Sequence, residues 1–283
     1  MKYTLALAQI DPVLGDLRAN VDKHADFAGR ARTRGAALVL FPELSLTGYT
    51  VRDMNTELAL NLTRDCPAIA PLVDLSRSGI SIVAGGIEED SEFGIYNAAF
   101  LFEDGNVRVV HRKVYPPTYG MFEEMRYFAR GRTVRAFDTK LGRMGVLICE
   151  DFWHISLPYL LALDGAATIL GLIASPTRIG PEEPEFNSPI VNSENYRVYA
   201  RMLSVHLAVA NRVGFEDGVN FWGGSQVVIP GGETLVAAKT FDEDLVLAEI
   251  DDDAMRQARR ASRHFLDEDP KLVAAELTRL RMV

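Results

Sequence analysis

Residues 142–164 have the sequence GRMGVLICEDFWHISLPYLLALD, and this stretch decides the fold class. Its apolar run over Met144–Cys149 predicts a buried strand, and the pattern over Ser156–Asp164 predicts a helix. A second apolar run, Thr168–Ala174, follows after a short turn. A strand, a helix and a strand in this order indicate a helical crossover, the connection typical of α/β proteins.

The same alternation extends through the rest of the chain. Further strands are predicted at Thr4–Ile10, Ala37–Phe41, Ile80–Ala84, Asn97–Phe102, Val107–His111, Val205–Asn211, Gln226–Ile229, Thr234–Ala238 and Leu245–Ile250, and further helices at Arg18–Arg34, Pro67–Ser78 and Ser188–Leu203. Residues 103–106 (EDGN) and 230–233 (PGGE) have the composition of hairpin turns. Hairpins and crossovers in one chain indicate a layered α/β or α+β domain.

We divide the chain into a body over residues 1–250 and a tail over residues 251–283. No linker, low-complexity tract or repeat interrupts the body. The tail is charged and helical in pattern, with a break at Asp269-Pro270, and we expect it to pack on the body or on a partner subunit. Gly35–Glu43 and Gly142–Glu150 are both apolar runs that end in a carboxylate, which indicates either two similar halves or simply two buried strands.

Composition excludes several classes of protein. The 283 residues include 30 Lys and Arg against 39 Asp and Glu, a net charge of −9, which argues against a nucleic-acid-binding surface. No apolar run approaches the roughly 18 residues of a membrane span, and the N-terminus lacks the pattern of a signal peptide. Two cysteines, Cys66 and Cys149, are too few for a disulfide framework or a cysteine-rich zinc site. We therefore expect a cytoplasmic protein in a reducing compartment.

Cys149 ends a buried strand, and the sequence then changes at once to the polar and aromatic run EDFWH. A cysteine inside a strand is usually a small hydrophobic residue. At the carboxyl end of a strand, before a helix, it has the position of a nucleophile, because such a turn exposes the sulfur to backbone N–H groups. Cys66 precedes Pro67 in polar surroundings and is interpreted as structural.

A thiol nucleophile needs a base, since a free cysteine is mostly protonated at neutral pH. Of the five histidines, His24 and His264 are predicted on helix surfaces and His206 in a buried strand, while His111 and His154 stay possible bases. Glu43 is the other candidate, because it follows a buried strand where an unpaired charge is costly. Its alternative interpretation is a carboxylate at a helix N-terminus.

Lys113 is the third residue that needs an explanation. A predicted strand leads directly into it, and the loop that follows, VYPPTYGMFEE over residues 114–124, is rich in aromatics, prolines and glycine. Loops of this kind often line pockets. A solvated lysine at a sheet edge is the alternative.

Together these segments resemble the nitrilase superfamily of carbon–nitrogen hydrolases, which has a Glu–Lys–Cys triad in that order. The matching segments are FPELSLTGY with Glu43, HRKVYPPTYGMFEEMRYFARG with Lys113, and GVLICEDFW with Cys149. The resemblance extends through ANRVG at 210–214 and GGS at 223–225, and fades after about Ile250. Within the superfamily, the PTYG and CED segments are most similar to the glutaminase domain of glutamine-dependent NAD synthetases.

This resemblance implies a four-layer α-β-β-α sandwich and a thiol amidase that acts on a small linear amide without a metal or organic cofactor. It makes Glu43 the general base, Cys149 the nucleophile and Lys113 the cation that stabilises the oxyanion. Glu124, rather than its neighbour Glu123, matches the second glutamate of the family, which orients the substrate. The substrate-binding residues would be Tyr49, Tyr119, Phe122, Glu150, Trp153 and Ser175. A homodimer or higher homo-oligomer is expected, with the tail as a candidate contact.

The sequence departs from the NAD synthetases in two ways. It ends at Val283 with no Ser-Gly-Gly-x-Asp-Ser pyrophosphate loop, and residues 177–185 differ from the basic loop expected of a glutaminase. These differences leave open a stand-alone amidase or a glutaminase subunit that supplies ammonia to a separate synthetase-like partner. A non-catalytic scaffold with the same fold and a papain-like Cys–His hydrolase that uses His111 or His154 are the remaining alternatives.

Overall fold

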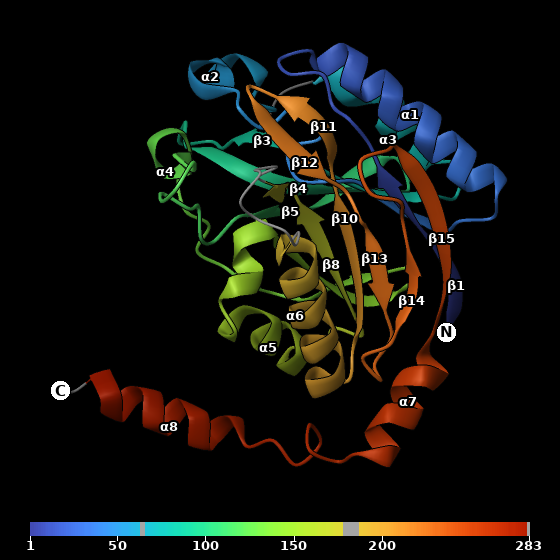
Figure 1. Cartoon of the computed structure of the whole chain (residues 1–283), viewed down its shortest axis with the longest axis vertical. Coiled ribbons are helices and arrows are strands. Elements are labelled where there is room, and N and C mark those ends of the chain that lie inside the picture. Colours follow the sequence, from blue (N-terminus) through green and yellow to red (C-terminus); the bar gives the residue numbers. More distant parts are fainter. Residues whose placement is uncertain (63–65, 178–186, 282–283) are drawn as a thin grey trace.

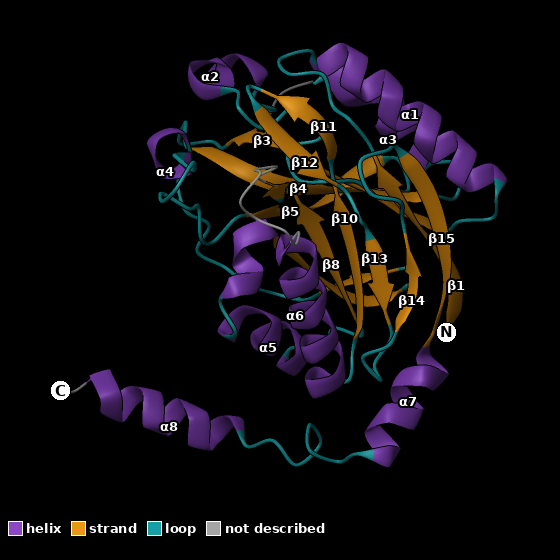
Figure 2. Ribbon diagram, viewed as in Figure 1, coloured by secondary structure: helices purple, strands orange, loops and turns teal. Residues whose placement is uncertain are grey.

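The structure, a computed structural model, describes residues 1–62, 66–177 and 187–281. Within these ranges the strands form two six-stranded sheets and one three-stranded sheet. Helices cover the outer faces of the two large sheets (Figures 1 and 2). Among the described residues, no helix is both long and apolar enough to cross a membrane.

The first large sheet has the order β15 (Asp244–Asp251), β1 (Lys2–Gln9), β2 (Leu38–Leu40), β3 (Ser81–Glu89), β4 (Ile95–Glu103) and β5 (Asn106–Arg112). The second has the order β14 (Thr234–Ala237), β13 (Gln226–Val228), β10 (His206–Asn211), β8 (Thr168–Ile173), β7 (Gly142–Ile148) and β6 (Phe137–Thr139). The small sheet joins β11 (Val213–Glu216), β12 (Val219–Trp222) and β9 (Pro176–Thr177).

The helices are α1 (Leu17–Thr33), α2 (Asn55–Leu58), α3 (Ala70–Ser76), α4 (Glu124–Tyr127), α5 (Ser156–Leu163), α6 (Asn187–Leu203), α7 (Asp252–Ala261) and α8 (Pro270–Arg281). Short 3₁₀ turns occur at Arg52–Met54, Pro67–Ile69 and Cys149–Trp153. Every strand and helix predicted from the sequence is therefore present within a few residues, and both predicted hairpins are confirmed by the pairing of β4 with β5 and of β13 with β14.

Alternating side chains on each strand build the four layers. On β1, Ala6 and Ala8 face the core shared with α1 and α3, whereas Leu5 and Leu7 face the core between the two large sheets. Side chains of the second sheet, such as Ile148 on β7, enter the same inter-sheet core, and a third core lies between that sheet and α5 and α6. The α-β-β-α sandwich is confirmed.

The two large sheets repeat one strand order. From β1 to β5 the neighbours pair parallel, parallel, antiparallel and antiparallel, and β7, β8, β10, β13 and β14 pair in the same sequence. β15 and β6 each add an antiparallel strand at the matching edge. The chain therefore contains two similar halves. The two apolar runs that indicated them, however, form β2 and β7, which do not hold equivalent places in the repeat.

The tail leaves the body after β15 as α7 and α8 (Figure 1). Two hydrogen bonds tie the segment between these helices to the body: His264 Nε2 to the Met202 carbonyl at 2.7 Å, and the Tyr159 hydroxyl to Glu268 at 2.9 Å. The break predicted at Asp269-Pro270 is confirmed, since α8 begins at Pro270.

Gly85 on β3 packs directly against the segment that follows β2. A Cβ atom at this position would lie 2.5 Å from both the Pro42 carbonyl oxygen and the Leu44 nitrogen. The Leu46 amide donates to the Gly85 carbonyl at 2.9 Å, so β3 fixes the path of residues 42–46. Backbone atoms, unlike the end of a flexible side chain, cannot easily move aside to make room for a Cβ atom at residue 85.

We expect Gly85→Ala to lower the free energy of unfolding by about 1–3 kcal/mol, because the added methyl group must displace the 42–44 backbone. Gly29→Ala on α1 is the matched control: nothing lies within 4 Å of its added Cβ. There the substitution should stabilise the helix by about 0.5–1 kcal/mol. Urea unfolding of both variants tests the difference, and equal stability of the two would contradict this packing.

Candidate active site

Lys113 lies directly after β5 with 1% of its surface exposed. Its ammonium nitrogen is 2.6 Å from Glu43 Oε1 and 2.7 Å from Glu124 Oε1. Burial acts to lower the pKa of this ammonium group, but Glu124 and Glu43 outweigh burial and raise it well above its usual range. Lys113 is therefore a permanent cation, and the solvated-edge alternative is wrong.

Glu43 is buried in the segment that follows β2 in the chain, and Gly85 packs against this segment. Its Oε1 atom accepts from Lys113 and also from Asn97 Nδ2 at 2.8 Å. Its Oε2 atom is buried and has no hydrogen-bond partner in the described part of the chain. The carboxylate is therefore held through one oxygen, with the other left to accept a proton.

Glu124 begins α4 and is buried beside Lys113. The Tyr49 hydroxyl donates to its Oε1 atom at 2.5 Å. Burial raises the pKa of Glu124 to about 7; Lys113 acts in the opposite direction and Glu43 adds to the increase. Near neutral pH the cluster thus exchanges a proton at Glu124 while Lys113 stays charged. The neighbouring Glu123 is exposed.

Cys149 begins the 3₁₀ turn after β7 with φ +47°, a left-handed conformation that a non-glycine residue rarely adopts. Burial raises the pKa of the thiol well above its usual range and the Glu43 charge adds to this, while Lys113 and the Ala174 N–H lower it. The thiol is therefore protonated at neutral pH and needs a base to become a nucleophile. Its turn conformation is strained in the manner of a nucleophile elbow.

Asp151 joins the Cys149 turn to the Lys113 segment. Its Oδ1 atom accepts from the amides of Val114 at 3.1 Å and Tyr115 at 2.9 Å, and its Oδ2 atom accepts from the Ile148 amide at 3.1 Å. The side chain is fully buried. Sequence reasoning missed both Asp151 and Asn97. The only signals were the polar residue at the start of the apolar run 97–102 and the second acidic residue after Cys149.

Cys149 opens into a cavity of about 310 Å³ that the predicted substrate-binding residues largely line. The lining consists of Tyr119, Phe122, Cys149, Glu150, Trp153, Ser175, Pro176, Val191 and Asn192. The Tyr119 hydroxyl donates to Glu150 Oε2 at 2.7 Å, and Asn192 Nδ2 donates to Ser175 Oγ at 3.1 Å. Part of the 177–185 segment in which the sequence departs from glutaminases, residues 178–185, lies outside the described residues.

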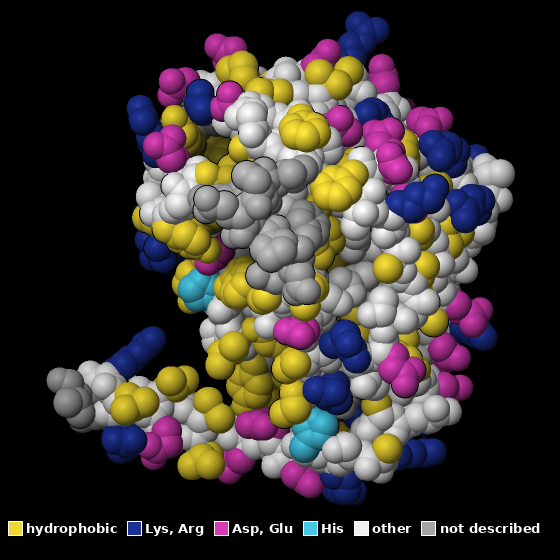
Figure 3. All heavy atoms as spheres, viewed as in Figure 1, with side chains coloured by type: hydrophobic (Ala, Val, Ile, Leu, Met, Phe, Trp, Pro, Cys, Tyr) yellow, Lys and Arg dark blue, Asp and Glu magenta, His cyan; other side chains and the backbone are white. Residues whose placement is uncertain are grey.

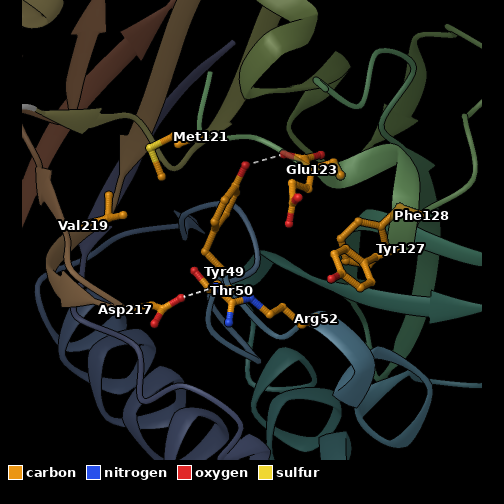
Figure 4. A pocket seen from close by; sticks show the side chains of 10 residues that line it. Tyr49, Thr50, Arg52, Met121, Glu123, Tyr127, Phe128, Asp217 and Val219 are labelled. Carbon is orange, nitrogen blue, oxygen red and sulfur yellow. Dashed lines mark hydrogen bonds and ion pairs between the residues drawn. The ribbon is translucent and has the colours of Figure 1, made fainter. Parts of the chain in front are cut away.

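Tyr49 lines a second cavity, of about 230 Å³, rather than the one at Cys149 (Figure 4). This second cavity reaches Glu124, and an Arg52–Asp217 ion pair of 2.6 Å forms part of its wall. The Tyr49 hydroxyl donates to Glu124, and its ring packs edge-on against Phe122, which lines the Cys149 cavity.

The histidines have other partners. His111 Nε2 lies 3.7 Å from Asp151, and the His154 ring stacks on Tyr115. The prediction of His24 on a helix surface is wrong: its ring is buried, stacks on Phe41 and contacts Ser45 Oγ at 2.9 Å. Burial lowers its pKa to about 4. That face of α1 turns inward onto the sheet.

Within the described ranges, no three His, Cys, Asp or Glu side chains are placed to hold a metal ion. Lys113, Glu43, Glu124, Asn97 and Tyr49 are instead joined to one another by hydrogen bonds and ion pairs. The chemistry that this arrangement can perform is proton transfer to a carboxylate, attack by a thiol, and stabilisation of negative charge by an ammonium group.

Comparisons with known proteins agree on one protein family. A model of the carbon-nitrogen hydrolase family matches residues 4–260. A glutamine-dependent NAD(+) synthetase of Thermotoga maritima is 33% identical over 253 residues, covering 88% of this chain and 42% of that protein. The chain thus spans under half the length of this relative.

Two solved structures agree over nearly the whole chain. An amidase from Nesterenkonia sp. is 28% identical with a TM-score of 0.75, covering 93% of this chain and 95% of that one. A carbon-nitrogen hydrolase from Helicobacter pylori, 24% identical, shares the fold with a TM-score of 0.87 and coverage of 98% and 99%. The family match and the shared sandwich show that the chain is an enzyme of the carbon–nitrogen hydrolase family, the nitrilase superfamily that its motifs indicate.

Proposed function

We propose that the protein is a thiol amidase that hydrolyses the C–N bond of a small linear amide through a Cys149 thioester. One arrangement carries the proposal: the Cys149 thiol lies on a strained turn at a cavity, and Glu43, whose charge acts on that thiol, has one buried oxygen that accepts no hydrogen bond from the described residues. A protonated thiol requires a base, and Glu43 supplies one.

In the acylation step, Glu43 takes the thiol proton as Cys149 Sγ bonds to the amide carbon. The tetrahedral oxyanion is stabilised by the Lys113 ammonium and the Glu150 backbone N–H, each donor contributing about 3–4 kcal/mol. The C–N bond then breaks, and Glu43 returns the proton to the leaving nitrogen. Ammonia or an amine departs, and the acyl group stays on sulfur as a thioester.

In the deacylation step, Glu43 takes a proton from water as the water oxygen bonds to the thioester carbon. The C–S bond breaks, the carboxylic acid leaves, and Cys149 regains its proton from Glu43. Glu124 holds Lys113 in place through both steps and orients the amide. A reducing, cytoplasmic setting suits this cycle, because Cys149 must remain a thiol.

A glutaminase subunit that feeds a separate synthetase-like partner is the second candidate. The 33% identity to glutamine-dependent NAD(+) synthetases favours it. It requires a preference for glutamine and stimulation by the partner, whereas a stand-alone amidase works alone on other amides. The complete Glu43, Lys113 and Cys149 set argues against a non-catalytic scaffold.

Cys149→Ala should reduce amide hydrolysis by at least about 10³-fold with an unchanged melting temperature, because no thioester can form. Ammonia release from a panel of glutamine, asparagine, ω-amides, N-carbamoyl compounds and nitriles provides the assay and identifies the substrate. Cys66→Ser is the matched control and should stay active. Activity retained by Cys149→Ala would refute the proposal, and loss of activity on replacing His111 or His154 with Glu43 dispensable would support a Cys–His mechanism.

The raised pKa of Glu124 predicts a pH-dependent stability. The folded carboxyl binds its proton up to about pH 7, the unfolded one only up to about 4.5. This contribution is therefore fully present below about pH 4.5 and is lost as the pH rises through 7, about 3 kcal/mol in all.

Glu124→Gln removes this titration, so its melting temperature should fall less steeply than that of the wild type between pH 4.5 and 7.5. Glu123→Gln, an exposed neighbour, should keep the wild-type slope. Calorimetric scans at four pH values across this interval provide the measurement. Parallel curves for all three proteins would show that Glu124 does not titrate in this range.

We also propose that residues 1–250 form the hydrolase domain and that the tail, residues 251–283, contributes to a homodimer contact. Leu272, Leu277 and Leu280 of α8 are exposed. Figure 3 shows hydrophobic side chains gathered over α5 and α6, where Leu160, Val198 and Met202 are exposed. Light scattering should report a dimer for the full chain and a monomer for a chain ending at residue 250. The same oligomeric state for both chains would exclude the tail from the contact.

A further inference from the structure

Asn97 on β4 contacts three members of the site at once. Its side chain is 1% exposed, and its Nδ2 atom lies 2.8 Å from Glu43 Oε1 and 3.5 Å from Glu124 Oε2. Its backbone carbonyl accepts the Lys113 amide at 2.9 Å. The amide nitrogen must face the carboxylates, since the amide oxygen in that place would repel them.

The arrangement of donors gives the two oxygens of Glu43 different roles. Lys113 Nζ and Asn97 Nδ2 both donate to Oε1, at 2.6 and 2.8 Å. Oε2 is buried and receives no donor from the described residues. Donors stabilise the negative charge on the oxygen they bind, so Oε2 is the oxygen open to a proton.

We propose that Asn97 is a positioning residue for the hydrolysis: its amide fixes Glu43 through Oε1 and so presents Oε2 as the atom that exchanges protons with Cys149 and with water. Asn97 does not touch the substrate in this role. The inference rests on the proposed function, because it assigns Glu43 as the base. It adds a side chain outside the Glu–Lys–Cys set and the second glutamate.

The charges that face Asn97 make its neutrality important. Glu43 and Glu124 approach its amide, and Lys113 is the cation between them. Beyond this first set, the Tyr49 hydroxyl donates to Glu124, and Glu43 and Lys113 act on the pKa of Cys149. A carboxylate in place of the amide would keep the shape of the side chain, remove both N–H donors and add a negative charge. Asn97→Ala removes both the shape and the N–H donors of the side chain, whereas Asn97→Asp keeps the shape and removes the donors.

The test compares Asn97→Ala and Asn97→Asp with Ser81→Ala. Ser81 Oγ donates at 2.7 Å to Glu103, a buried carboxylate at the opposite end of β4 from Asn97. Ser81→Ala therefore removes one donor from a buried carboxylate outside the Glu43, Lys113 and Glu124 cluster. Two readouts are measured: kcat and KM on the best amide of the panel, and the rate at which iodoacetamide alkylates Cys149 as a function of pH. Peptide mass spectrometry follows Cys66 as the internal reference.

We expect kcat to fall about 10- to 100-fold in Asn97→Ala with KM changed less than about threefold, and further in Asn97→Asp. Alkylation of Cys149 relative to Cys66 should slow in the same order, and its rise with pH should move to higher pH. Ser81→Ala should lower the melting temperature but leave both readouts unchanged.

Two outcomes would overturn the inference: Asn97→Asp as active as the wild type, or Asn97 variants that lose stability alone, as Ser81→Ala does. Failure of the proposed function is a separate result, since Cys149→Ala would then remain active whatever the Asn97 variants do. The alkylation rates need no substrate, so they test the orientation of Glu43 even if no amide in the panel is hydrolysed.

Discussion

The site depends on one buried ammonium group held between two carboxylates. Lys113 neutralises one of the two negative charges that Glu43 and Glu124 bring together, and the remaining charge is accommodated by a raised pKa at Glu124 and by neutral donors from Asn97 and Tyr49. Removing any partner from a buried group of this kind leaves an uncompensated charge. The surrounding sheets must therefore hold all five side chains at fixed positions.

The sandwich meets this requirement with backbone rather than with flexible side chains. β3 presses Gly85 against the segment that carries Glu43, and β4 accepts the Lys113 amide through Asn97. Asp151 links the residues after Lys113 to the residue before Cys149. The main chain at Glu43 and at Lys113 is thus fixed by a neighbour in a different element.

Most strands could be predicted, and Glu43, Lys113 and Cys149 could be singled out, because both leave local signals. Long apolar runs mark β1, β3, β4 and β8, and Glu43, Lys113 and Cys149 each stand at or just after the end of a predicted strand. β6, β9, β11 and β12 were missed because none contains an apolar run; β11 and β12, for example, contain or adjoin glycine and acidic residues. The contacts of His24 with Ser45, of Asn97 with Glu43 and of Asp151 with Val114 join residues distant in sequence, so no local pattern reveals them. The contact of Tyr49 with Glu124, which places Tyr49 in the second cavity, likewise depends on how the segments around residues 49 and 124 meet.

The division of the site between the two sheets has a consequence for the distance between Glu43 and Cys149. Glu43, Asn97 and Lys113 belong to the first sheet, whereas Cys149 and Ala174 follow strands of the second. The spacing between the Glu43 carboxylate and the Cys149 thiol therefore depends on the apolar layer that Leu7, Leu40, Ile148 and their neighbours fill between the sheets. A change in the volume of this apolar layer would alter the distance between the two side chains without replacing a single polar atom of the site.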